Sequence, residues 1–158
     1  MGFETDRALQ EMYRDALAEQ IVRTLVTGAD WQQFKSIRDG ARQKETQETD
    51  AYRQDYAARV DKVRRELLRK AGAKTHDHPT PFGVDRFNKD RINRQAQQIV
   101  RHDHANRVHR IVSDEVSALE GLRDDIAGRS RVKDIARGAF ARAVDRRAGP
   151  DRRGPSRA

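Results

Sequence analysis

The chain has 158 residues, of which 37% are charged and 35% are apolar. Ordinary globular domains carry about 25% charged residues, so we expect one domain or helical scaffold without a thick, closed core. The chain has no cysteine, which excludes disulfides and thiolate metal sites. No apolar run approaches the roughly 20 residues needed to cross a bilayer.

The first predicted region covers residues 1–72 and begins with a helix from about Thr5 to Thr27. Apolar residues recur there at steps of three and four, which is the period of a helix with one apolar stripe. The stripe contains Leu9, Met12, Tyr13, Ala16, Leu17, Ile21 and Leu25. Gly28 is placed to end this helix, and Asp30 with Gln33 fits the start of the next one.

Gly40 predicts a bend after this second, short helix. A third helix is predicted from about Thr46 to Ala71. Its apolar stripe is narrow and consists of Tyr52, Tyr56, Val60, Val63 and Leu67, with charged residues elsewhere. We expect Leu9, Met12, Leu17 and Ile21 to pack against Tyr52, Tyr56, Val60 and Leu67, or against a protein partner.

Residues 73–84 contain Pro79, Pro81 and Gly83, which predict an extended hinge. A long helix is predicted over residues 85–128, with Gly128 as its break. Its buried side is expected to hold Phe87, Ile92, Ala96, Ile99, Val100, Val108, Ile111, Val112, Val116, Leu119, Leu122 and Ile126. Residues 129–158 then form a basic amphipathic helix, near Ser130 to Arg147, and a tail.

No alternating strand pattern and no internal repeat occurs. The sequence therefore predicts an all-α, elongated scaffold of four or five amphipathic helices, with a Pro/Gly hinge and a basic C-terminal tail.

The net charge of +8 is concentrated in residues 129–158, where ten basic and three acidic side chains give +7. Such a field attracts polyanions. Nucleic acid, an acidic protein surface and simple solubility each account for it, and charge alone does not separate them. The residues expected to hold an anionic partner are Arg137, Arg142, Arg146, Arg147, Arg152 and Arg153.

Five histidines invite a metal site, since imidazoles and carboxylates can hold zinc. Helical geometry argues against one, because His102 and His109 would lie about 10 Å apart along a helix. A site would need His76 and His78 to fold back onto them. His104 falls between Val100 and Val108 and fits a half-polar place in the stripe.

A segment that runs from Leu25 through Gly28, Asp30 and Trp31 to Gly40 resembles short helical proteins of tailed-phage structural gene clusters. In those proteins a helix ends at glycine and an acidic–aromatic pair starts the next. The resemblance covers residues 25–40 and implies a role in virion assembly or in the capsid interior.

The sequence contains no phosphate-binding loop, nucleophile elbow or dinucleotide-binding turn. We therefore expect a non-enzymatic structural or assembly protein without a cofactor. It would work within a homo- or hetero-oligomeric assembly such as a phage virion, in the cytoplasm or within the virion, and without membrane contact. The alternatives are a sequence-neutral DNA-binding accessory protein of a mobile element and, third, a metal-dependent hydrolase that uses the histidines.

Overall fold

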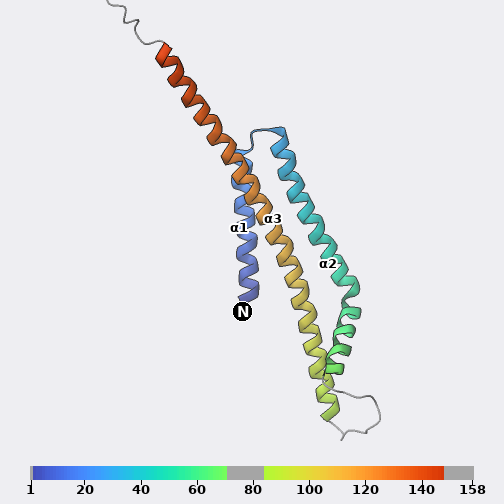
Figure 1. The fold of residues 1–158 in the computed structure, drawn as a ribbon. Helices are drawn as coiled ribbons and strands as arrows, with labels where there is room; N and C mark the ends of the chain where they lie inside the picture. Colours follow the sequence, from blue (N-terminus) through green and yellow to red (C-terminus); the bar gives the residue numbers. More distant parts are fainter. Residues whose placement is uncertain (1, 71–83, 148–158) are drawn as a thin grey trace, which may run out of the picture.

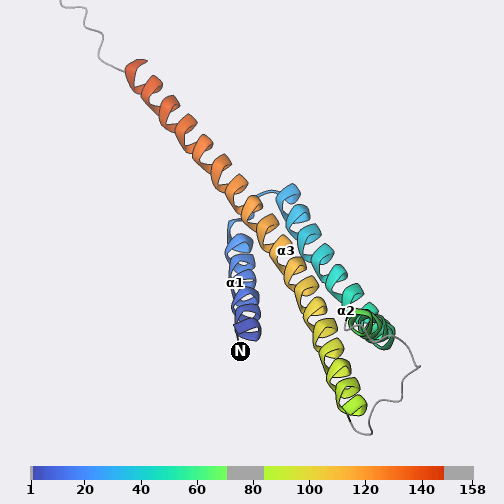
Figure 2. The same cartoon turned by 60° about the horizontal axis from the view of Figure 1, so that its bottom comes forward.

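The structure is a computed structural model that describes residues 2–70 and 84–147. These residues form three helices: α1 (Gly2–Thr24), α2 (Gly28–Lys70) and α3 (Val84–Arg147). The 64 residues of α3 span about 95 Å at 1.5 Å per residue. α1 runs parallel to α3 and α2 runs antiparallel to it (Figure 1). Both shorter helices pack against α3, which lies between them (Figure 2).

The fold is all-α within the described residues, as predicted, but the predicted number of four or five helices was wrong. α2 runs through Gly40 and α3 runs through Gly128 without interruption. Glycine ends a helix by adopting a left-handed backbone, and neither residue does so here. In a helical conformation a glycine costs only about 1 kcal/mol relative to alanine, which a long helix tolerates. The predicted hinge at Pro79–Gly83 and the tail beyond Arg147 lie outside the described residues.

The turn between α1 and α2 also differs from the prediction. α1 ends at Thr24 instead of Thr27, and α2 already begins at Gly28. The N-cap of α2 is Thr27 and not Asp30, because the Thr27 hydroxyl accepts a hydrogen bond of 3.1 Å from the Asp30 backbone N–H. Asp30 therefore lies inside the first turn of α2, where its negative charge faces the positive end of the helix dipole.

The core is a single seam along α3. Its buried residues recur at steps of three and four and are Ala96, Val100, Val108, Val112, Leu119, Leu122 and Ile126. All seven belong to the predicted stripe. Leu17, Ala18 and Ile21 of α1 and Phe34 of α2 complete one cluster around Leu119, Leu122 and Ile126. The core is therefore thickest beside the α1–α2 turn.

Within the described ranges, no helix combines the length and apolar character that crossing a membrane requires.

Candidate partner-binding surface

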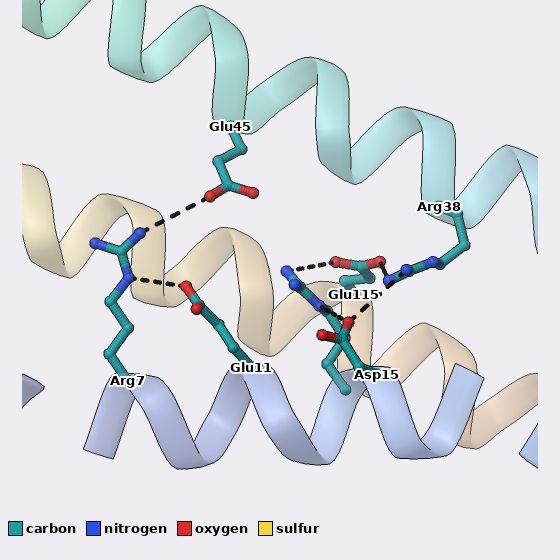
Figure 3. A network of polar contacts seen from close by, with 7 residues as sticks. Arg7, Glu11, Asp15, Arg38, Glu45 and Glu115 are labelled. Atoms are coloured by element: carbon teal, nitrogen blue, oxygen red, sulfur yellow. Dashed lines mark hydrogen bonds and ion pairs between the residues drawn. The ribbon is translucent and has the colours of Figure 1, made fainter. Parts of the chain in front are cut away.

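A buried carboxylate joins the three helices. Glu115 of α3 lies in the core seam, and its side chain is only 4% exposed. It accepts a hydrogen bond of 2.7 Å from Arg38 of α2, and Arg14 of α1 lies 3.6 Å from its other oxygen (Figure 3). Asp15 lies near both cations, at 3.1 Å from Arg14 and 3.8 Å from Arg38. The cluster contains side chains from all three helices, so it fixes how these helices pack against one another.

The pKa of Arg14 is raised above its ordinary value, although its burial acts in the opposite direction. The hydrogen bond to Asp15 and the charge of Glu115 outweigh that burial. These contacts favour the charged form of Arg14, which lies beside the buried Glu115 side chain.

A second polar position of the seam is His104. Its ring stacks on Tyr52 of α2 at a centroid distance of 4.0 Å, and its Nδ1 lies 3.3 Å from Glu48. Arg59 donates a hydrogen bond of 3.3 Å to the same carboxylate. Burial would raise the pKa of Glu48, but the hydrogen bonds from His104 and Arg59 lower it below its ordinary value. This carboxylate is thus held ionised between α2 and α3.

The third position is Arg129, which donates a hydrogen bond to the buried Asp30. This bond lowers the pKa of Asp30, and hydrogen bonds from Thr27 add to the effect. Asp30, Arg38 and Glu48 follow one another along α2. Their respective partners on α3 are Arg129, Glu115 and His104, so the position on α3 falls as the position on α2 rises. A slide of α2 by one helical turn would break all three, so polar pairs set its antiparallel register.

The C-terminal part of α3 extends past the other two helices (Figure 1), although Arg129 near its base still contacts Asp30 of α2. We call Ala127–Arg147 the α3 extension. Every residue of it except Gly138 is exposed. Its apolar side chains include Val132, Ile135, Phe140 and Val144, which are 66%, 69%, 72% and 47% exposed. With Ala136, Ala139 and Ala143 they recur at steps of three and four and form an apolar face over about half of the helix circumference, from Ile135 at one edge to Val144 at the other.

Cations border this apolar face along both edges. At 3.6 residues per turn, Arg131 and Arg142 follow the Ile135 edge and Arg137 follows the Val144 edge, while Lys133 projects between Phe140 and Val144. The two acidic residues of the extension, Asp134 and Asp145, lie on the opposite side. The face is therefore apolar in the middle and basic toward its edges.

The predicted anion-binding residues are only partly described. Arg137, Arg142, Arg146 and Arg147 are exposed on the extension, but they are distributed around the helix and do not form one patch. Arg152 and Arg153 lie outside the described residues. The predicted anion-binding set does not contain Arg131 and Lys133, although a helical projection places both beside the apolar side chains of the extension.

The predicted stripe of α1 splits into two faces. Leu17 and Ile21 are buried in the core, whereas Leu9 and Met12 are 61% and 68% exposed. Leu9, Met12, Tyr13 and Ala16 form what we call the α1 outer face. The half-buried stripe of α2, which contains Tyr52, Tyr56, Val60 and Leu67, belongs to the helix that packs on α3. The stripes of α1 and α2 thus meet α3 and not each other.

An open notch of about 670 Å³ lies where the extension leaves the α1–α2 turn. Val26 and Asp30 of the turn region and Ile126 and Arg137 of α3 are among its lining residues. The side chain of Val26 is 79% exposed, and that of the nearby Trp31 is 50% exposed. The base of the extension is therefore also incompletely covered.

The histidine candidates do not form a metal centre in the described part of the chain. His102 and His109 are exposed on α3, and His76 and His78 lie outside the described residues. Within residues 2–70 and 84–147, no group of three or more His, Cys, Asp or Glu side chains is arranged to hold a metal ion.

Comparison with known proteins gives no relative for this chain. No family model, no curated protein and no solved structure matches it.

Proposed function

We propose that this protein is a non-enzymatic structural component of a larger assembly and that the α3 extension docks on an acidic protein surface. The observation that carries the proposal is the exposed apolar face of Val132, Ile135, Phe140 and Val144. Burial of such a side chain contributes about 1.5–3 kcal/mol. A helix of this length without tertiary contacts is marginal in water, so a partner that covers the face would stabilise it.

A protein surface suits the extension better than a nucleic acid does. Duplex phosphates would engage the cations but would leave the apolar face uncovered. The cations at and near its edges, Arg131, Arg142, Lys133 and Arg137, instead match acidic rims around an apolar groove. The resemblance of residues 25–40 makes a virion the assembly that we propose.

The second candidate is sequence-neutral DNA binding by an accessory protein. It is favoured by the charge of +7 on residues 129–158. Its phosphate contacts would come from Arg137, Arg142, Arg146 and Arg147 and from Arg152 and Arg153 of the tail. The affinity of such contacts falls steeply with salt.

Two substitutions on the extension separate these functions. Binding of the full chain to a labelled mixed-sequence duplex is measured by fluorescence anisotropy over a salt series, with Phe140→Ser and Arg142→Gln as variants. In parallel, a photo-crosslinking residue replaces Ile135 on the apolar face or Ala141 on the polar face of the chain in its native cells. We expect protein crosslinks from position 135 but not from position 141, and their loss on Phe140→Ser.

Duplex binding would then be weak and would not depend on Phe140. The proposal is overturned if duplex binding is tight, becomes weaker and less salt-dependent with Arg142→Gln and is indifferent to Phe140→Ser, while neither position crosslinks to protein.

A further inference from the structure

The α1 outer face is a second uncovered apolar surface. Leu9, Met12 and Tyr13 are 61%, 68% and 47% exposed, and Ala16 is exposed beside them. The spacing of three, four and seven residues from Leu9 places these side chains on one side of α1. That side differs from the one that carries Leu17 and Ile21 into the core.

Most of the charged residues around this face are acidic, although Arg23 projects between Met12 and Ala16, and Arg123 of α3 interacts with Tyr13. By helical projection, Asp15 and Glu19 follow its Met12 edge, and Asp6 precedes it on the Tyr13 edge. The Tyr13 hydroxyl donates a hydrogen bond of 2.8 Å to Glu120 of α3, which brings a further carboxylate to that edge. The whole of α1 has five acidic and three basic side chains, a formal charge of −2.

The α3 extension has the complementary character. Its residues, Ala127–Arg147, carry seven basic and two acidic side chains, a formal charge of +5. Their cations border an apolar face, just as acids border the α1 outer face. One surface is thus apolar with basic edges and the other is apolar with acidic edges, and both are uncovered in the isolated chain.

We propose that the α3 extension of one copy docks on the α1 outer face of a second copy. This inference rests on the proposed function, because it names the chain itself as the acidic protein partner. The contact joins two different surfaces, so each copy still has one of each to offer. Such heterologous contacts repeat into rings or open chains, which suits a component of a larger assembly.

The two surfaces cannot meet within one chain. The extension is a continuous part of α3 and points away from α1, past the turn that joins α1 to α2 (Figures 1 and 2). Pairing of two extensions is also disfavoured, because each carries a charge of +5. A second copy's α1 offers both the apolar cover and the opposite charge.

The decisive experiment uses two full-length variants that each disable one surface. Met12→Glu places a charge on the α1 outer face, and Phe140→Glu places one on the extension. Both side chains are exposed, so both variants should fold, which circular dichroism checks. Gln47→Glu on α2 and Ala141→Glu on the polar face of the extension are controls with the same change in charge at exposed positions.

Sedimentation velocity over a concentration series measures self-association. We expect the wild-type chain and both controls to associate, and each interface variant to associate about tenfold more weakly or not at all. An equimolar mixture of Met12→Glu and Phe140→Glu should form a one-to-one dimer, since one chain retains an intact extension and the other an intact α1 outer face. That dimer cannot grow, because its remaining surfaces are the disabled ones.

A wild-type chain that stays monomeric at every concentration overturns the inference, as does a mixture that stays monomeric. Flotation with anionic phosphatidylserine vesicles is the remaining arm. Flotation that Phe140→Glu abolishes, in a chain that does not self-associate, would assign the extension to a membrane instead. These failures differ from that of the proposed function, which appears as arginine-dependent duplex binding.

Discussion

Removal of the charge of Glu115 should destabilise the fold more than removal of any surface charge. Glu115→Gln keeps the shape of the side chain but leaves Arg14 and Arg38 without their buried counter-charge. Loss of one partner of a fully buried pair costs about 3–5 kcal/mol. Here the two arginine side chains are 16% and 25% exposed, and Asp15 stays close to both, so part of the loss is compensated. We expect the free energy of unfolding to fall by about 2 kcal/mol.

For a chain of this size, that loss lowers the thermal midpoint by about 4–8 °C. The direct assay is a double-mutant cycle with Glu115→Gln and Arg38→Gln in urea unfolding at one fixed chain concentration. The coupling energy should be about 1–2 kcal/mol. The matched control is the half-exposed pair Arg7–Glu11 within α1, whose coupling should not exceed about 0.5 kcal/mol. Equal coupling in the two cycles would refute the role of Glu115 as a buried connection among three helices.

Three further substitutions test local features of the structure. Gly128→Ala should raise the free energy of unfolding by about 0.5–1 kcal/mol, because α3 is continuous there and nothing lies within 4 Å of the added Cβ; a bend at this position would make the change unfavourable. Thr27→Ala should cost about 1 kcal/mol in thermal unfolding, whereas Thr46→Ala, in the middle of α2, should cost almost nothing. The bond from Arg129 lowers the pKa of Asp30, so ionised Asp30 stabilises the fold at pH values above its unfolded-state pKa. This stability is lost as the pH falls through the lower folded-state pKa. Arg129→Met should therefore flatten the acid limb of a stability–pH profile below about pH 4.

The helical period of the sequence was sufficient to predict the core side of α3. All seven of its buried apolar residues fall in the predicted stripe, because spacing determines which side of a helix is apolar and a neighbouring helix covers that side here. Glu115 was missed, although a signal existed: the steps from Val112 to Leu119 pass through it. A carboxylate in the seam between buried apolar positions indicates a cation from another helix, but the sequence does not show which one.

The number of helices was harder to predict. Gly40 and Gly128 have the residue type of helix ends, yet their backbone stays helical, since a glycine inside a long helix costs only about 1 kcal/mol relative to alanine. At the α1–α2 turn, Thr27 and Asp30 are both residue types that favour the N-cap position. Which of them caps α2 depends on where the chain reverses, because Asp30 must reach Arg129. That contact joins residues 99 positions apart, so no local pattern contains it.

The apolar stripe of α3 becomes wider where the extension begins. Phe140 and Val144 follow Leu122 and Ile126 by 18 residues, or five full turns, and therefore stay in line with the core seam. Val132 and Ile135 lie to one side of that line, so the extension adds apolar side chains at angles where the seam has none. One unbroken helix thus carries a narrow seam followed by a wider apolar face, and only the seam is covered by this chain's own α1 and α2.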